Sequence, residues 1–75
     1  MKHTKTDPRL ILIGKQVAVN QLYKESRFSL RFRIERLEGN MFEGTVFEAS
    51  ENSPYPVGSS YSVSENEIKY HSVLS

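Results

Sequence analysis

Apolar and polar residues alternate strictly between Phe28 and Ile34. Every even position in this stretch is apolar and every odd position is polar or charged, a period of two that is typical of a β-strand with one face against a core. Gly39-Asn40 follows, and glycine and asparagine tolerate the positive φ angles of a tight hairpin turn. Because residues 41–49 supply a second apolar segment, the pattern predicts a central β-hairpin over residues 27–49.

The register of this hairpin follows from its turn. If Gly39 and Asn40 are the two loop residues, each strand residue has one predicted partner. The facing pairs are Glu38–Met41, Arg36–Glu43, Ile34–Thr45, Phe32–Phe47, Arg31–Glu48 and Leu30–Ala49. A slip by one residue would set Phe32 against Glu48 and turn the apolar side chains of the second strand to the wrong face. Two opposite-charge pairs and one aromatic pair therefore support this register.

A second apolar set falls on the other face of the predicted ribbon, where Leu37, Phe42 and Val46 lie with Gly44. A flat sheet would leave this set exposed, whereas a strongly bent ribbon that wraps on itself would bury both faces. Glycine inside a strand commonly marks a bend or a bulge. The pattern therefore predicts a bent hairpin at the centre of a small barrel.

The N-terminal third predicts a tail and one further strand. Residues 1–9 are polar and contain Asp7-Pro8, so we expect a flexible tail before a single domain over residues 10–75. Leu10–Ile13 is predicted to be a short strand or the lead-in to one. Residues 16–23 are predicted as a strand because Val17 and Val19 are β-branched and alternate, with a helix as the alternative.

The C-terminal part predicts a long loop and two short strands. Residues 50–60 are dense in serine, proline and glycine, which punctuate regular structure. Residues 61–64 resume the alternation, residues 65–67 break it, and residues 68–73 are predicted to form the last strand. Polar residues 24–26 are predicted to connect the first strand to the central hairpin.

Four or five short strands around one bent hairpin define an all-β class. The arrangement resembles a small, partly open antiparallel barrel of the SH3-like kind, with an OB-like barrel as the alternative. This resemblance concerns the fold alone, and because such barrels carry many unrelated functions it implies no activity.

Composition narrows the classes of function. The 75 residues suffice for one small domain, and the absence of cysteine excludes disulfides and thiolate metal sites. The one apolar run, Leu10–Ile13, is too short for a secretory signal or a membrane span, so we expect a cytoplasmic protein without a membrane partner. Ten basic and nine acidic side chains give a net charge of +1, so no global field attracts nucleic acid.

Motifs for catalysis or for cofactors are not found in the sequence. Gly14-Lys15 lacks the first glycine and the hydroxyl residue of a phosphate-binding loop, and no Gly-x-Ser-x-Gly motif occurs. His71 shares a predicted strand face with Glu67, but Lys69 stands between them and would repel a cation. We therefore predict neither an enzyme nor a bound metal or cofactor.

A basic row is the first candidate surface. Arg27, Arg31 and Arg33 share one face of the first hairpin strand, and Lys24 comes just before it. Beside exposed tyrosines, such a row can follow a phosphodiester backbone while aromatic rings stack on bases. The alternative is that the arginines are cross-strand partners of neighbouring glutamates such as Glu48, which leaves a small net field.

The predicted loop provides the second candidate surface. Tyr55 stands between Pro54 and Pro56, and a proline-stiffened loop loses little conformational entropy when it docks on a partner. Tyrosine adds apolar area and a hydroxyl group, which suits a protein interface. Tyr61, at the start of the next strand, is a further candidate binding residue. The alternative is that Tyr55 folds down over the mouth of the barrel.

These features predict a small non-enzymatic protein-interaction module that acts as a regulator, inhibitor or accessory subunit. Its candidate surfaces are the basic row, the Tyr55 loop and an open barrel edge. An edge can add a strand from a partner or from a second copy, so we expect a monomer or an edge-paired homodimer. The alternative is a nucleic-acid-binding barrel that uses its arginine-rich strand face, with an affinity that falls steeply with added salt.

Overall fold

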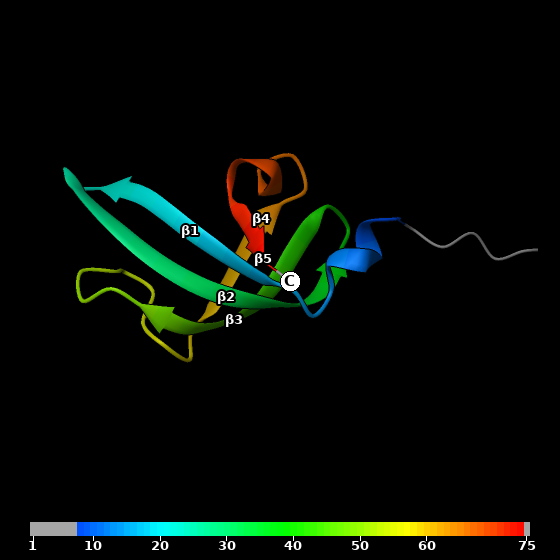
Figure 1. Cartoon of the computed structure of the whole chain (residues 1–75), viewed down its shortest axis with the longest axis horizontal. Helices are drawn as coiled ribbons and strands as arrows, with labels where there is room; N and C mark the ends of the chain where they lie inside the picture. Colours follow the sequence, from blue (N-terminus) through cyan, green and yellow to red (C-terminus); the bar gives the residue numbers. More distant parts are fainter. Residues whose placement is uncertain (1–7, 75) are drawn as a thin grey trace, which may run out of the picture.

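A computed structural model describes residues 8–74 of the protein. These residues form one antiparallel sheet with the strand order β4-β3-β2-β1-β5 (Figure 1). The elements are η1 (Pro8–Leu12), β1 (Gln16–Tyr23), β2 (Ser26–Glu38), β3 (Met41–Ala49), β4 (Ser60–Ser64), η2 (Ile68–Tyr70) and β5 (Ser72–Leu74), where η denotes a 3-10 helix. The all-β prediction is confirmed. The sheet is not closed into a barrel, because β4 and β5 are its two edges and do not pair with each other.

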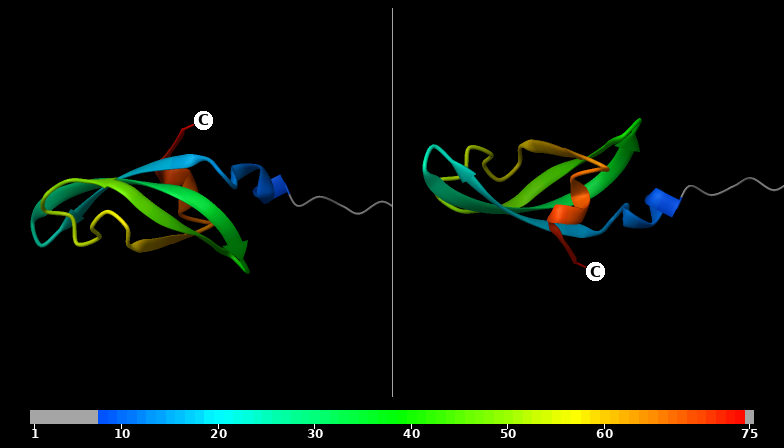
Figure 2. Two further views of the ribbon diagram at one scale, coloured as in Figure 1. Left: turned by 90° about the horizontal axis from the view of Figure 1, so that it is seen from below. Right: turned by 90° about the horizontal axis from the view of Figure 1, so that it is seen from above.

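The sheet is strongly bent. Two further views show β2 and β3 curving together, with residues 50–59 and β4 on the concave side of β1 and β2 (Figure 2). The buried apolar side chains fill this concave side. They are Val17, Val19, Phe28, Leu30, Phe32, Ile34, Phe42, Val46, Val63 and Ile68.

Two β-bulges shape the β2–β3 hairpin. The pairing shifts between Ile34 and Arg36 and again between Arg31 and Phe32, which leaves Glu35 unpaired on β2 and one residue, Phe47, unpaired on β3. Each bulge adds one residue to a different strand, so the two shifts cancel. The two ends of the hairpin therefore keep one common register while its middle is displaced by one residue.

The predicted register is accordingly right at the ends and wrong in the middle. The pairs observed as predicted are Glu38–Met41, Arg36–Glu43, Arg31–Glu48 and Leu30–Ala49. The predicted pairs Phe32–Phe47 and Ile34–Thr45 do not form, because both β2 residues pair one position earlier along β3. An alternating sequence pattern does not reveal an extra residue in one strand when a second bulge, in the other strand, restores the register.

The bulges also bring the apolar residues of the hairpin to a single face. The extra residue Glu35 moves the odd-numbered Leu37 to the same face as the even-numbered apolar residues of β2, and Leu37 lies opposite Phe42. On β3, the extra residue Phe47 places the buried Val46 opposite Phe32. The prediction of two apolar faces is therefore wrong: one continuous concave face carries both sets. The expected bend of the hairpin is what makes this face concave.

Gly44 permits a close approach between the two strands. It lies opposite Ile34, next to the bulge at Glu35. A Cβ atom at this position would lie 1.7 Å from the carbonyl oxygen of Arg33, so no other residue fits without moving the backbone. This confirms that Gly44 marks a bulge.

The strand predicted over residues 16–23 is confirmed as β1, which pairs with β2 along its whole length. The connection is tighter than expected, because Ser26 already belongs to β2. Lys24 and Glu25 alone form the loop, with φ angles of 50° and 68°. Positive φ at both loop residues is the geometry of a type I′ hairpin turn.

No strand forms at Leu10–Ile13, because Pro8–Leu12 forms the 3-10 helix η1; the alternative prediction, a lead-in to a strand, is confirmed, since β1 begins at Gln16. Proline fixes a φ angle that suits the first turn of a helix. The Arg9 side chain anchors η1 through an ion pair with Glu65 at 2.6 Å and a hydrogen bond that it donates to the Gly39 carbonyl at 3.2 Å. Residues 1–7 of the predicted tail lie outside the described residues.

The last predicted strand is shorter than expected. Residues 68–70 form η2, and only Ser72–Leu74 pairs with β1. The turn lets Ile68 reach the core, where it is buried, before the chain continues to the edge of β1. The strand predicted over residues 61–64 is confirmed as β4, which begins one residue earlier.

Candidate binding surfaces

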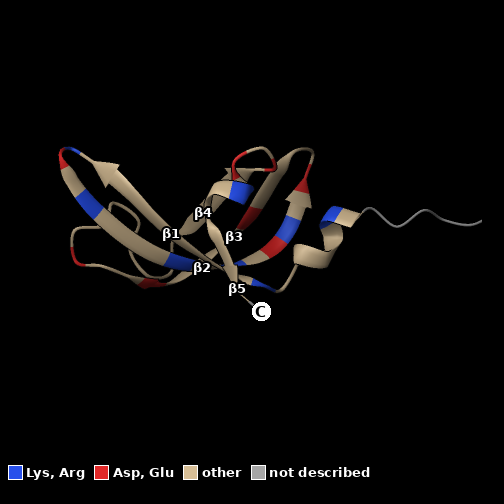
Figure 3. Cartoon of the chain, turned by 45° about the horizontal axis from the view of Figure 1, so that its top comes forward, with Lys and Arg blue, Asp and Glu red and all other residues tan. Residues whose placement is uncertain are grey.

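The arginine face is the outer, convex side of β2. Arg27, Arg31 and Arg33 lie opposite Leu22, Ala18 and Gln16 of β1, which places the three arginines on one face of the sheet, as predicted. Figure 3 shows basic positions recurring along β2, with acidic ones among them toward the β2–β3 turn. The three arginines therefore do share one face, but acidic residues lie along the same strand, so the strand does not carry positive charge alone.

Each arginine of this face has a neighbour within the protein. Arg27 donates a hydrogen bond to the Asn20 side-chain oxygen at 3.2 Å. Arg31 forms an ion pair with Glu48 at 3.6 Å, and both side chains are exposed. The Arg33 guanidinium lies 5.9 Å from the centre of the Phe47 ring. Exposed ion pairs contribute only about 0 to 1 kcal/mol to stability, so these contacts orient the side chains without removing them from solvent.

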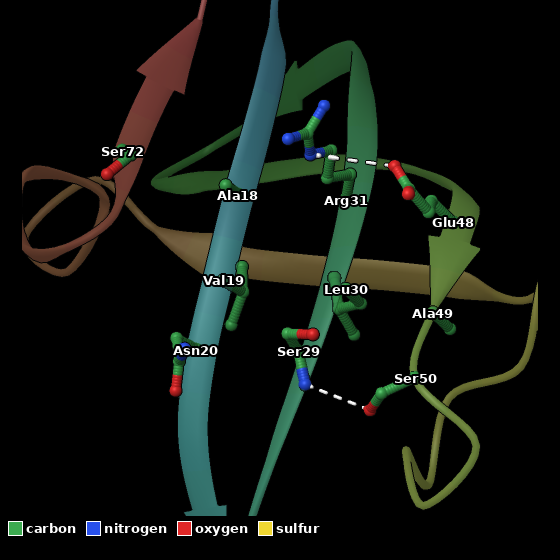
Figure 4. Close-up of a pocket in the computed structure, with 10 residues that line it drawn as sticks. All are labelled: Ala18, Val19, Asn20, Ser29, Leu30, Arg31, Glu48, Ala49, Ser50 and Ser72. Atoms are coloured by element: carbon green, nitrogen blue, oxygen red, sulfur yellow. Dashed lines mark hydrogen bonds and ion pairs between the residues drawn. The ribbon is translucent and has the colours of Figure 1, made fainter.

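A shallow groove of about 450 Å³ lies on the same outer face (Figure 4). Arg31 and Glu48 face each other at one end, while Asn20, Ser29 and Ser50 lie toward the other. The Ser50 hydroxyl is already engaged: it accepts a hydrogen bond from the Ser29 amide at 3.1 Å and donates one to the Asn52 side-chain oxygen at 2.7 Å. The groove therefore presents mainly small polar groups beside one arginine, and the Ser50 hydroxyl among them is already hydrogen-bonded.

The aromatic end, defined as Tyr23, Phe28, Tyr55 and Tyr61, lies where the β1–β2 turn meets the loop of residues 50–59. The Tyr55 ring centre is 4.9 Å from that of Tyr61 and 6.3 Å from that of Phe28, and Tyr23 meets Phe28 edge-on at 6.3 Å. Tyr61 continues this contact chain to the buried ring of Phe32 at 5.0 Å. The aromatic end is therefore a surface held directly by the core.

Tyr55 does fold onto the mouth of the sheet, which was the alternative to a freely projecting loop residue. It nevertheless keeps 39% of its surface exposed, Tyr23 keeps 45%, and the neighbouring Val57 keeps 62%. Burial raises the pKa of Tyr61 above its usual value, and the neighbouring Tyr55 and Glu67 add to this shift. Tyr61 is thus an inner support of the aromatic end, and Tyr55 and Tyr23 are its outer rings.

The loop that carries Tyr55 is fixed by hydrogen bonds. Asn52 donates to the Arg27 carbonyl at 2.7 Å, and the Ser53 hydroxyl bonds both the amide and the carbonyl of Tyr55 at 3.0 Å. The Gly58 amide donates to the Val46 carbonyl at 2.8 Å. These bonds tie the loop to β2 and β3 and fix the backbone at Tyr55.

The predicted site residues thus divide between two surfaces. Arg27, Arg31 and Arg33 lie on the outer face, whereas Tyr55 and Tyr61 lie at the aromatic end; Lys24 occupies the β1–β2 turn, with its ammonium group 5.5 Å from the Tyr23 ring centre. The sequence prediction missed Tyr23 and Phe28 of the aromatic end, and Asn20, Ser29, Ser50 and Ser72 of the groove. A two-residue turn at Lys24-Glu25 is the signal that would have placed Tyr23 and Phe28 on one face.

Neither a metal cluster nor a membrane-spanning helix is found among residues 8–74. In that range, no three His, Asp or Glu side chains gather as metal ligands would. No helix there is long and apolar enough to cross a bilayer. His71 follows η2 instead of sharing a strand face with Glu67 and Lys69, so that predicted arrangement is wrong.

Comparisons with protein-family models, with curated protein sequences and with solved structures give no match.

Proposed function

We propose that the protein is a small non-enzymatic protein-interaction module, acting as a regulator, inhibitor or accessory subunit, and that its partner binds at the aromatic end. The observation that carries this proposal is the pair of outer rings, Tyr55 and Tyr23, which are partly exposed yet fixed against Phe28 and Tyr61. Tyrosine is enriched among the residues that dominate interface energetics. Rings that are already ordered also lose little entropy on binding.

The fold proposed for this module is an SH3-like, partly open barrel. Two features support it over an OB-like barrel: strands β1 to β4 follow one another as neighbours in the sheet, and a 3-10 turn precedes the last strand, which returns to the free edge of β1. An OB barrel has a Greek-key connection instead.

A photo-crosslinking experiment tests the proposed surface. Phe47 is the matched control, because its ring is also 39% exposed but lies on the outer side, next to Arg33. A photoreactive phenylalanine analogue is placed at position 55 or at position 47 of the full chain, in cells that naturally produce it. We expect a discrete protein adduct from position 55 and none from position 47. An adduct that forms only from position 47 would move the interface to the outer face and contradict the proposal.

Nucleic-acid binding at the arginine face is the second candidate function. The observation in its favour is the placement of Arg27, Arg31 and Arg33 on one face beside a groove and the Phe47 ring. Three phosphate contacts give a slope of log K against log salt of about −2 to −3. Affinity would therefore fall by about 16- to 64-fold between 50 and 200 mM salt.

Fluorescence anisotropy with single- and double-stranded DNA and RNA measures this slope. Arg31→Ala should weaken binding and reduce the slope by about one contact. Tyr55→Ala is the matched control and should leave binding unchanged if the arginine face is used. No binding even at low salt excludes this candidate and leaves the protein-interaction proposal in place.

A further inference from the structure

The edge of β1 is open over five consecutive residues. β5 pairs only with Gln16–Ala18, so within residues 8–74 Val19–Tyr23 has β2 on one side and no strand on the other. This segment reads Val-Asn-Gln-Leu-Tyr and contains neither a charged residue nor proline. Natural sheets usually protect a free edge with such residues, because an unprotected edge pairs with other strands.

The hydrogen bonds of β2 establish which backbone groups of this edge point outward. The Ser29 amide and carbonyl both bond Ser50 on the β3 side, at 3.1 and 2.8 Å, and the Arg27 carbonyl accepts a bond from Asn52. Ser29 and Arg27 therefore turn their backbone groups away from β1, and their partners Asn20 and Leu22 turn theirs away from β2. No hydrogen bond to the backbone of Asn20 or Leu22 on this open side is found within residues 8–74.

We infer that two copies of the chain pair antiparallel through Val19–Tyr23, around a two-fold axis at Gln21. In this register Asn20 of each copy faces Leu22 of the other. Each copy has two outward amides and two outward carbonyls, and all of them are paired in four hydrogen bonds across the interface. A register centred on Asn20 or on Leu22 pairs only half of these groups. Self-pairing of one edge also gives a closed, isologous dimer instead of an open filament.

The length of the open segment fits this register. At its start β5 blocks the edge, since Ser72 faces Ala18. At its other end the pairing stops because each chain turns toward its own β2 at Lys24, one residue after Tyr23. In this register Tyr23 of one copy faces Val19 of the other. Leu22, 65% exposed in the monomer, becomes partly covered by Asn20 of the other copy. At the other free edge, β4, the backbone is partly used already, because the Ser64 carbonyl accepts a hydrogen bond from the Glu67 amide at 3.0 Å.

This dimer goes beyond the proposed function, because it uses the backbone of β1 and leaves the Tyr55 ring free; Tyr23, the other outer ring, belongs to both surfaces. Five residues from each copy make an interface smaller than the roughly 1,200 to 2,000 Å² of stable complexes. We therefore expect a concentration-dependent dimer with a dissociation constant of about 1 μM or weaker.

Cysteine cross-linking tests the register, since the chain has no cysteine of its own. In the dimer Gln21 faces Gln21 in a closely spaced pair that does not share hydrogen bonds, so Gln21→Cys should form a disulfide-linked dimer under mild oxidation. Ser62→Cys is the matched control at the centre of the exposed β4 edge. We expect Gln21→Cys to cross-link about tenfold faster than Ser62→Cys, or more, because the dimer raises the effective concentration of one thiol beside the other. Equal rates, or a faster Ser62→Cys, would overturn the proposal.

Leu22→Pro provides the second measurement. Proline removes the outward amide of Leu22 without removing a bond to β2, so the monomer should keep its fold by circular dichroism. Two of the four interface bonds are lost because the dimer contains two copies. Sedimentation equilibrium should show a concentration-dependent dimer for the wild type and a monomer for Leu22→Pro. A wild type that stays monomeric at hundreds of micromolar, or a Leu22→Pro variant that dimerises as the wild type does, would contradict the inferred interface.

Discussion

Replacing Gly44 with alanine should be among the most damaging single substitutions in this chain. The added Cβ atom would lie 1.7 Å from the Arg33 carbonyl oxygen and 2.7 Å from its carbon, which are both backbone atoms, and 3.1 Å from the Phe32 ring. No side-chain rotation relieves the first two overlaps, so β2 and β3 must separate locally. That movement disturbs ladder bonds beside the bulge at Glu35 and loosens the packing of Phe32, the fully buried core residue opposite Val46.

The expected loss is about 4 kcal/mol or more, at the upper end of what single substitutions cause. A domain of this size has a free energy of unfolding of only about 4 to 11 kcal/mol, so Gly44→Ala should leave it partly or wholly unfolded at room temperature. Urea denaturation followed by far-ultraviolet circular dichroism measures this directly, since the chain contains no tryptophan.

Gly39→Ala is the matched control for the Gly44 substitution. Gly39 has a φ of 60° but open space around its Cβ position, so this change costs only the conformational penalty of about 1 to 2 kcal/mol. A Gly44→Ala protein with a denaturation midpoint equal to that of Gly39→Ala would refute the close approach of β2 and β3, and with it the bulged register.

Three further predictions concern the turn, the aromatic end and η1. Lys24→Asn combined with Glu25→Gly should raise the free energy of unfolding by about 1 kcal/mol or more, because both loop residues have positive φ; an unchanged urea midpoint would refute this. Because the pKa of Tyr61 is raised in the folded protein, its contribution to stability is full below the ordinary tyrosine pKa and is lost as pH rises through the raised pKa. Tyr61→Phe should therefore flatten the alkaline fall of the urea midpoint, and an equally steep fall in the variant would contradict the burial of this hydroxyl. Arg9→Ala should lower stability by about 1 kcal/mol or less at low salt, with a smaller loss at high salt, since its ion pair with Glu65 is partly exposed; a salt-independent loss would point to packing instead.

The sequence predicted the β2–β3 hairpin well because two independent signals agree there, the alternation from Phe28 to Ile34 and the Gly39-Asn40 turn. It did not predict the middle of the register. The bulges at Glu35 and Phe47 compensate each other, so the end pairs fit an unbulged ladder as well as a bulged one. Only the packing of both strands around one core distinguishes the two.

The terminal segments show where local pattern is insufficient. Leu10–Ile13 is apolar enough for a strand, but η1 leaves Ile11 exposed and directs the chain so that the Gly14 amide donates to the Ile34 carbonyl at 2.7 Å. The sequence pattern places Ile68 in the last strand, yet this residue lies in η2 and is buried there. In both cases a tertiary contact, which short-range periodicity does not contain, decides the local structure.

The candidate surfaces were predictable to different degrees. Arg27, Arg31 and Arg33 share one face because side chains alternate between the two faces along a single strand, and the structure confirms this prediction. The aromatic end depends on three segments that are distant in sequence, so Tyr23 and Phe28 were not recognised as neighbours of Tyr55.

The most direct measurement of the proposed function is a binding isotherm for the protein that crosslinks at position 55. It compares the wild type with Tyr55→Ala and with Phe47→Ala, two variants that each remove an aromatic ring of 39% exposure from opposite surfaces. We predict that Tyr55→Ala weakens binding by about tenfold or more, which corresponds to about 1.4 kcal/mol, and that Phe47→Ala changes it by less than about twofold. Equal losses in the two variants, or a loss confined to Phe47→Ala, would contradict binding at the aromatic end.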